Sequence, residues 1–208
     1  TGSSLTTHLV KPIVSASCIK THLAGFITAT ICTLKNLAGT IVSSILEELN
    51  GLIANGSAFN AYLESNTERP AFDTHGMADN DDWGALYLWR NGEPVPENQA
   101  LCPVTTEAMN ALPLVFSGQR CPNILFSRLR PGAKIPPHNG MINTRLIGHL
   151  PLIIPEDCGF RVGNSTRTWN VGEAFLFDDA VEHEAWNNSA EDRYVLIFEV
   201  WRPGLTEP

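Results

Sequence analysis

The sequence predicts a mainly β domain, built as a sandwich or barrel, that follows a helical segment. From residue 122 onward, short apolar runs alternate with turn signals at close spacing. Between residues 19 and 49, apolar residues recur at three- and four-residue steps, as on one face of a helix. The chain has 208 residues, of which 43% are hydrophobic and 17% charged, enough for one folded core. We therefore expect a helical segment over residues 1–80, packed on a β domain over residues 81–208.

The helical pattern predicts one helix, or two helices broken near Gly39. Its spacing lacks a strict heptad, which favours packing on the β domain over a partner-binding zipper. Residues 51–70 mix Gly, Asn and Ser with single apolar residues and predict a helix end followed by a loop. The apolar positions are Ile19, Leu23, Phe26, Ile27, Leu34, Leu37, Ile41, Ile45, Leu46 and Leu49.

The next elements alternate between strand and turn signals. The run Trp83–Arg90 predicts a strand, and Asn91-Gly92 after it is a strong hairpin-turn signal. A proline-containing loop over residues 94–96 follows, and then a short helix over residues 105–112 with a threonine as its N-cap. The later predicted strands cover residues 123–129, 145–154, 158–162, 174–177, 181–186 and 194–201.

Charge and composition exclude several classes of partner. The chain has 14 Lys and Arg against 22 Asp and Glu, a net charge of −8, which is the opposite of a nucleic-acid-binding footprint. No run is apolar for long enough to cross a bilayer, and the first residues lack the layout of a signal peptide. The five cysteines show no disulfide-framework spacing, which favours a reducing compartment. We expect a cytoplasmic protein with neither nucleic acid nor a membrane as its partner, which leaves a small molecule or peptide to be argued from the motifs below; the oligomeric state is left open.

Two histidines of the β region form a candidate metal site. His138 follows two prolines and precedes Gly140, and His183 lies 45 residues later, where an acidic loop runs into a strand. Neutral imidazoles suit Fe(II), but the familiar iron site adds a carboxylate where this chain has Gly140. On spacing alone, two unrelated loop histidines remain the favoured alternative.

An arginine gives the metal interpretation its support. Arg193 stands ten residues after His183, at the head of an apolar strand, where it can point into a hydrophobic barrel. A buried arginine needs an anion, and the distal carboxylate of 2-oxoglutarate would fit it. The alternative is a surface cation beside two acidic residues. Further polar contacts would come from Ser127, Arg145 and His149.

A series of short motifs carries a family resemblance. In order along Trp83–Pro203, the chain resembles the aspartyl/asparaginyl β-hydroxylase family. The motifs are Phe126-Ser-Arg-Leu-Arg-Pro-Gly132, Pro137-His-Asn-Gly140, Asn143-Thr-Arg-Leu146, His149-Leu-Pro-Leu152, Arg161-Val-Gly163, Trp169, Gly172, Phe177-Asp-Asp179, Glu182-His-Glu-Ala-Trp186 and Arg193. Residues 1–80 carry no part of the resemblance.

The resemblance implies a double-stranded β-helix, a cupin-like jelly roll, that uses Fe(II), 2-oxoglutarate and dioxygen. His138 and His183 match the iron ligands, and Arg193 with Ser127 matches the residues that hold the distal carboxylate of 2-oxoglutarate. His149 matches a histidine near the other end of that cosubstrate. A glycine at position 140 is itself in the pattern of this family.

The resemblance also implies the reaction, which is hydroxylation of an unactivated carbon. We expect the target to be Cβ of an Asp- or Asn-like residue in a free amino acid, a short peptide or a carrier-tethered substrate. The family often has Arg where this chain has Ile147, while Arg145 lies two positions earlier, so substrate recognition departs from the pattern. Two alternatives stay open: a halogenase or other oxidative enzyme of the same fold, and a non-catalytic cupin-type binding protein.

Overall fold

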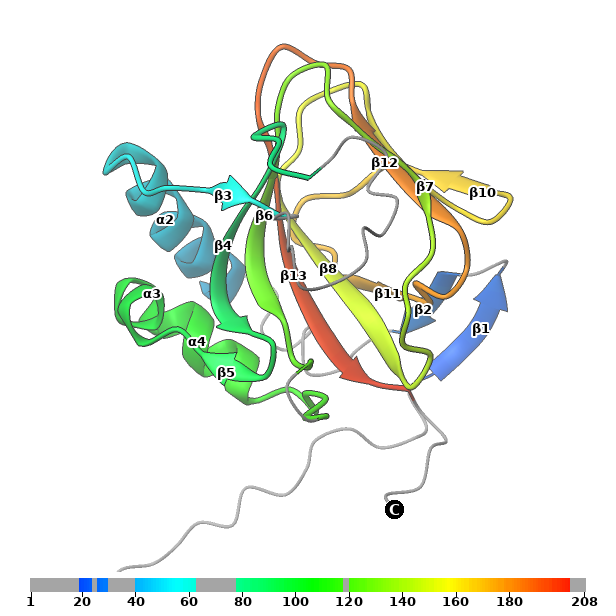
Figure 1. Cartoon of the computed structure of the whole chain (residues 1–208), viewed down its shortest axis with the longest axis horizontal. Helices are drawn as coiled ribbons and strands as arrows, with labels where there is room; N and C mark the ends of the chain where they lie inside the picture. Colours follow the sequence, from blue (N-terminus) through cyan, green and yellow to red (C-terminus); the bar gives the residue numbers. More distant parts are fainter. Residues whose placement is uncertain (1–18, 24–25, 30–39, 63–77, 118–119, 203–208) are drawn as a thin grey trace, which may run out of the picture.

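The computed structural model describes residues 19–23, 26–29, 40–62, 78–117 and 120–202, which form two facing antiparallel sheets and three helices (Figure 1). The larger sheet contains β1 (Ile19–Leu23), β2 (Phe26–Ala29), β3 (Asn60–Ala61), β4 (Trp83–Arg90), β5 (Glu93–Pro94), β6 (Ile124–Leu129), β8 (Arg145–Ile153), β11 (Phe175–Phe177) and β13 (Arg193–Trp201). The smaller sheet contains β7 (Lys134–His138), β9 (Cys158–Val162), β10 (Ser165–Arg167) and β12 (His183–Asn187). The helices are α2 (Thr40–Ala54), α3 (Pro96–Leu101) and α4 (Pro103–Asn110).

The strand order defines the two sheets, which face each other across the interior. The larger sheet runs β1-β2-β11-β8-β13-β6-β4-β3, with β5 on β4, and the smaller sheet runs β10-β9-β12-β7. Figure 1 shows α2, α3 and α4 on one side of the larger sheet, and β7, β10 and β12 on its other side. This arrangement confirms the mainly β, cupin-like jelly roll with a helix near its N-terminal end.

Strand β13 shows why the larger sheet has two buried faces. Successive side chains of a strand point to opposite sides. Tyr194, Leu196, Phe198 and Val200 belong to the hydrophobic cluster on the helix side, whereas Val195 and Ile197 contact the cluster between the sheets. Arg193 is two residues from Val195, so it lies on the inner face. An almost continuous apolar run is therefore what a central strand of this fold requires.

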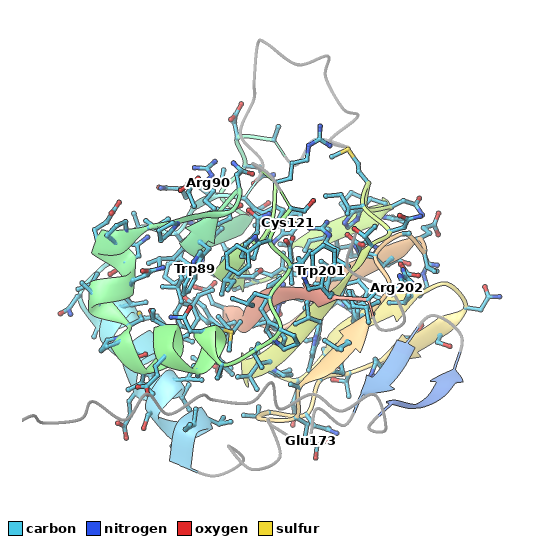
Figure 2. All side chains as sticks on the ribbon, turned by 90° about the horizontal axis from the view of Figure 1, so that it is seen from below. Trp89, Arg90, Cys121, Glu173, Trp201 and Arg202 are labelled. Atoms are coloured by element: carbon cyan, nitrogen blue, oxygen red, sulfur yellow. The ribbon has the colours of Figure 1, made fainter. Side chains whose placement is uncertain are left out.

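The helices cover the outer face of the larger sheet. Ile45 and Leu49 of α2 and Met109 of α4 join Trp89 of β4 in the helix-side cluster, and Figure 2 labels Trp89. The Glu48 carboxylate accepts hydrogen bonds from the backbone N–H of Val104 (2.7 Å) and from both the N–H and hydroxyl of Thr105 (2.9 and 2.6 Å). A side chain of α2 thus satisfies the free N–H groups at the start of α4. The predicted threonine cap is replaced by this longer-range contact.

The hairpin prediction is confirmed in detail. Asn91 and Gly92 have φ angles of 55° and 88°, and Arg90 pairs with Glu93 across the turn. Two consecutive residues with positive φ define the turn type whose twist suits adjacent antiparallel strands. The strands predicted over residues 83–90 and 158–162 match β4 and β9, and the other predicted strands agree with the observed ones within one or two residues at their ends.

The helix predicted from residue 19 is wrong over its first part. Ile19–Leu23 and Phe26–Ala29 are strands, and β2 pairs with β11 at the edge of the larger sheet. Isoleucine and threonine are frequent in this stretch, and β-branched residues favour extended backbone. The helix is confirmed only from Thr40 onward; residues 30–39 lie outside the described residues. The division of the chain at residue 80 stays a prediction, and strands from both sides of it pair in one sheet.

Several short elements were not predicted, among them α3, β7 and β10. Helix α3 begins at Pro96, the end of the loop expected over residues 94–96, and this proline occupies the first helical turn, where its missing N–H costs nothing. Strand β7 contains Pro136 and Pro137, and β10 has only three residues. Prolines lower the strand signal of a segment, although edge strands accept them. Strand β7 is at the edge of the smaller sheet and carries His138.

Candidate active site

The structure brings the two predicted metal ligands together. His138 ends β7, His183 begins β12, and the two residues are direct partners in the antiparallel pairing of these strands. Their ring centroids are 4.1 Å apart. Phe177, Phe160 and the edge of Trp83 lie around them, at centroid distances of 5.1 to 6.3 Å. The alternative of two unrelated loop histidines does not fit this geometry.

Each imidazole is oriented through its Nδ1 atom. Nδ1 of His138 is 2.8 Å from the Pro136 carbonyl oxygen, and Nδ1 of His183 is 3.0 Å from that of Val181. A carbonyl accepts from an N–H, so both rings are assigned the tautomer with the proton on Nδ1 and the lone pair on Nε2. This is the usual outer contact of a metal-bound histidine. Burial, and then the nearby His138, lower the pKa of His183 to about 4, which keeps the ring neutral at ordinary pH.

No carboxylate of the described ranges completes the pair, because no group of three or more His, Cys, Asp or Glu side chains there is placed to hold a metal ion. The N–H of Gly140 donates to the backbone oxygen of Asp179 at 2.6 Å. A Cβ atom at position 140 would clash with the carboxylate of Asp179. Because this carboxylate fills the space beside Gly140, a larger residue here would require Asp179 to move.

Arg193 is buried, and no ion pair to it is formed by the residues that the structure describes. Its side chain is 1% exposed, and its guanidinium carbon lies 5.1 Å from the centre of the Trp169 ring. In the part of the chain that the structure describes, its Nε and Nη2 atoms have no hydrogen-bond partner. Burial lowers the pKa of Arg193 to about 10. The surface-cation alternative is wrong, and a buried guanidinium without a counter-ion is the signature of an anion site.

Ser127 and His149 lie on the same inner face as Arg193. Strand β13 pairs with β6 through Val195 and Ser127, and with β8 through Ile197 and His149. These partners alternate with Arg193 along β13, so the three polar side chains point to one side of the sheet. Burial, followed by the charge of Arg193, lowers the pKa of His149 well below its ordinary value, and this ring is neutral.

Two tryptophans orient these groups. Nε1 of Trp83 donates to Oγ of Ser127 at 3.1 Å, and Nε1 of Trp169 donates to Nδ1 of His149 at 3.3 Å. An indole N–H only donates, so the Ser127 hydroxyl keeps its own proton for another acceptor, and the His149 proton is assigned to Nε2. Both groups are thus prepared to donate to an anion. No spacing signal in the sequence reveals this polar role of Trp83 and Trp169.

An aromatic wall connects the two parts of the site. The ring centroid of Phe177 is 5.1 Å from that of His149 and 5.1 Å from that of His183. Phe160 likewise contacts both histidines, at 5.1 and 6.2 Å. The histidine pair and the Arg193 group therefore face one interior with apolar walls. Electrostatic contacts are stronger in such an interior than in water.

Arg145, the remaining predicted residue, contacts two carboxylates. Its Nη1 bonds Glu199 and its Nη2 lies 2.9 Å from Oδ2 of Asp179. Burial alone would lower the pKa of Arg145, but the charges of Glu199 and Asp179 raise it above its ordinary value. Burial raises the pKa of Asp179 against the opposing effect of Arg145. Cys121 approaches the same guanidinium at 3.8 Å, and Figure 2 labels it together with Trp201, the strand partner of Arg145.

Sequence reasoning missed the acidic half of this cluster. In the sequence, Asp179 stands in the acidic loop before His183, and Glu199 stands in a strand that is otherwise apolar. Both are buried, with 5% and 4% exposure. A charged residue within a strand that is otherwise apolar, as Glu199 is, signals a buried pair, and Arg145 at the head of β8 is the matching signal.

None of the helices among the described residues is long and apolar enough to span a membrane. The cysteines that the structure describes as free are all buried: Cys102, Cys121 and Cys158. The compartment, which the cysteine pattern predicts to be the cytoplasm, stays a prediction.

Comparison with known proteins finds several relatives whose names include a hydroxylase. The human aspartyl/asparaginyl beta-hydroxylase is 36% identical over 138 residues, which is 64% of this chain and 18% of that protein. The ornithine lipid ester-linked acyl 2-hydroxylase of Rhizobium tropici is 33% identical over 145 residues, 66% of this chain and 50% of that protein. Human aspartate beta-hydroxylase domain-containing protein 2 is 35% identical over 127 residues, 60% of this chain and 34% of that protein.

These matches cover half or less of each relative's own length, so the relatives contain parts that this chain does not match. The sequence model of the Aspartyl/Asparaginyl beta-hydroxylase family matches residues 42–203, a range that runs from α2 past the end of β13 and includes the histidine pair, the Arg193 group and the Arg145 cluster. The chain belongs to the aspartyl/asparaginyl β-hydroxylase family of hydroxylases.

Proposed function

We propose that this protein is an Fe(II)- and 2-oxoglutarate-dependent dioxygenase that hydroxylates Cβ of an Asp- or Asn-like residue in a free amino acid, short peptide or carrier-tethered substrate. The observation that carries the proposal is the buried guanidinium of Arg193, whose Nε and Nη2 have no partner among the described residues and which faces the same aromatic-walled interior as the two neutral histidines. A pair of metal-binding histidines alone is compatible with many functions. An anion site beside it, in a family of hydroxylases, favours a carboxylate cosubstrate that reaches the metal.

The donor set fits the proposed cofactors. His138 and His183 would hold iron through Nε2, because their Nδ1 atoms are engaged with backbone carbonyls. Arg193 and Ser127 would hold the distal carboxylate of 2-oxoglutarate, and His149 would donate from Nε2 toward the cosubstrate. When bound, iron with 2-oxoglutarate and dioxygen supplies the oxidising power for hydroxylation, with succinate and carbon dioxide as coproducts.

The remaining contribution of the protein is orientation and exclusion of water. Trp83 and Trp169 fix the Ser127 hydroxyl and the His149 ring by hydrogen bonds, so these groups donate without reorganising. Phe160, Phe175 and Phe177 are all 4% exposed or less and line the interior beside the histidines. A dry interior protects an oxidising centre from side reactions with water.

The names of the relatives indicate which kind of C–H bond reacts. A β-hydroxylase of Asp or Asn and an acyl 2-hydroxylase both act, by name, on a carbon next to a carbonyl group. We therefore place the reacting C–H bond beside a carbonyl. The halogenase alternative would need a halide near Gly140, and the Asp179 carboxylate lies against that position. Hydroxylation is thus favoured over halogenation.

The test is a coupled assay. The iron-loaded protein is incubated with 2-oxoglutarate and a panel of asparaginyl and aspartyl compounds, free and in peptides, and succinate and product mass are measured. We expect succinate to form in step with a product heavier by one oxygen atom. Absence of 2-oxoglutarate turnover across the panel, in a protein that binds iron, would favour the non-catalytic binding protein.

A further inference from the structure

The cluster around Arg145 is charged, buried and only partly satisfied. The side chains of Arg145, Asp179 and Glu199 are 12%, 6% and 5% exposed, and both terminal nitrogens of Arg145 are engaged by the two carboxylates. Glu199 also accepts from the backbone N–H of Asn123 at 3.0 Å and from its side-chain amide at 3.4 Å. Two carboxylates thus face one guanidinium, so the cluster has no excess positive charge with which to bind an anion.

Two atoms of the cluster are unpaired as far as the described part of the chain goes. Among the described residues, neither Nε of Arg145, a donor, nor Oδ1 of Asp179, an acceptor, makes a hydrogen bond, and both atoms are buried. Nearly all buried polar atoms in native proteins are paired. An unpaired donor and an unpaired acceptor on two bonded side chains indicate a missing group that can both accept and donate.

The cluster borders the proposed reaction centre. The Asp179 carboxylate lies against Gly140, two residues from His138. On β8, Arg145, Ile147 and His149 alternate onto the inner face, and Ile147 is part of the hydrophobic cluster between the sheets. A substrate near the histidines would therefore meet apolar surface from Ile147 and a polar end at Arg145 and Asp179.

We propose that this cluster binds the side-chain carboxamide of an asparagine-like substrate and selects it over the carboxylate of an aspartate-like one. This inference rests on the hydroxylase function proposed above and assigns its substrate class. A carboxamide oxygen accepts from Nε of Arg145, and its NH₂ group donates to Oδ1 of Asp179. A carboxylate has only acceptors and would place a second negative charge against Asp179, which disfavours it.

The test compares two matched compounds that differ in this group alone, N-acetyl-L-asparagine N-methylamide and N-acetyl-L-aspartate N-methylamide. Their affinities for the protein loaded with Zn(II), a redox-inert metal, and 2-oxoglutarate are measured by calorimetry. We expect the asparagine compound to bind at least about tenfold more tightly, because the aspartate compound leaves Asp179 facing an acceptor. Equal affinities, tighter binding of the aspartate compound, or no detectable binding of the asparagine compound at millimolar concentration would overturn the proposal.

Two variants test whether Asp179 is the source of the preference for the asparagine compound. Asp179→Asn replaces one acceptor by a donor that a carboxylate can use, so the preference should shrink to within about threefold or invert. Asp178→Asn makes the same change one residue earlier, in a carboxylate that pairs with Arg202 at 2.6 Å, and should leave the preference unchanged. An unchanged preference in a folded Asp179→Asn protein would also overturn the proposal. If that variant does not fold, the wild-type preference alone decides.

Failure of this inference can be told apart from failure of the proposed function. Succinate formation with the aspartate compound in preference to the asparagine compound would refute the carboxamide site and leave the hydroxylase standing. Selective binding of the asparagine compound without any succinate formation in the iron-loaded protein would support the carboxamide site and refute the hydroxylase.

Discussion

At the residue scale, the histidine pair depends on two short backbone contacts. His138 and His183 each contact the carbonyl oxygen of the residue two positions earlier through Nδ1, so the local backbone sets the ring orientation. The two histidines are also direct partners in the pairing of β7 with β12. A metal site assembled in this way needs little support from other side chains.

We predict that His183→Ala abolishes tight metal binding while the fold is kept. The residue begins β12, and its loss removes one of two protein ligands without opening the helix-side core. Titration with Mn(II) or Co(II), beside a thermal unfolding curve, measures both effects. His149→Asn is the control, because His149 is a buried histidine outside the pair and its variant should still bind metal. Retained metal affinity in folded His183→Ala would refute the ligand assignment.

Arg193→Leu should weaken the binding of 2-oxoglutarate without weakening the binding of metal. Removing the guanidinium leaves the distal carboxylate of 2-oxoglutarate unpaired in a dry interior, a loss of about 2–5 kcal/mol and hence orders of magnitude in affinity. Metal affinity should stay near that of the wild type, because the histidines are untouched. Titration with metal and then with 2-oxoglutarate measures the two steps.

Arg202→Leu is the matched control for this prediction. Arg202 pairs with Asp178 and is 27% exposed in its side chain, so its variant should bind 2-oxoglutarate normally. If Arg193→Leu kept its cosubstrate affinity, the buried guanidinium would have another partner, and the oxygenase assignment would lose its main support.

At the element scale, helices α2 and α4 are joined through one carboxylate. Glu48 accepts three hydrogen bonds from Val104 and Thr105 at the start of α4, and the core beneath contains Leu49 and Met109. A negative charge at a helix N-terminus is favourable in itself and also satisfies free N–H groups. The contact therefore joins the middle of α2 to the start of α4.

Glu48→Gln should lower the free energy of unfolding by about 1–2 kcal/mol, because a neutral amide accepts more weakly and adds an unneeded donor. Chemical denaturation measures the loss. Glu47→Gln, an exposed neighbour on the same helix, should change stability by less than about 0.5 kcal/mol. Equal effects of the two changes would mean that the helix junction does not depend on this carboxylate.

The elements that sequence reasoning predicted are those whose signal is local. Strand β4 with its Asn91-Gly92 turn and the central strands of the β region combine apolar runs with clear turn residues. Strands β1 and β2 were missed because short apolar runs with isoleucine and threonine fit both a helical and a strand period. Strand β7 was missed because its prolines hide an edge strand, and its pairing with β12 is a long-range property.

The same distinction applies to the site. Motifs indicated His138, His183, Arg193, Ser127, Arg145 and His149, and the structure places the histidines as partners and Arg193 in the interior. Spacing could not show that two tryptophans orient Ser127 and His149, or that Arg145 is already paired with carboxylates. Those facts depend on which side chains meet across strands, and that is set by register.

At the scale of the whole molecule, the interior holds neutral groups that the unfolded chain would protonate in mild acid. The pKa of His183 is lowered from 6.5 to about 4, chiefly by burial. Below pH 6.5 the unfolded chain therefore binds a proton that the folded protein does not. The neutral His183 ring therefore contributes fully to the free energy of unfolding above pH 6.5, and this contribution is lost as the pH falls toward 4.

We predict that the metal-free protein loses stability steadily between pH 6.5 and pH 4, by roughly 1–3 kcal/mol from this group. Denaturant unfolding at a series of pH values, in the presence of a chelator, measures the slope. His183→Gln cannot take up the proton and should flatten the curve over this range. An identical slope in the variant would show that other groups control the acid sensitivity.

The close contact between Gly140 and Asp179 links the metal-ligand set to the charged cluster beside it. A side chain at position 140 would bring its Cβ against the Asp179 carboxylate, which is itself held by Arg145. That carboxylate would have to move, and the movement would weaken its ion pair with Arg145. Gly140→Asp should therefore destabilise the protein. An attempt to engineer a third, carboxylate ligand into the site would need Asp179 and Arg145 to be redesigned together with Gly140.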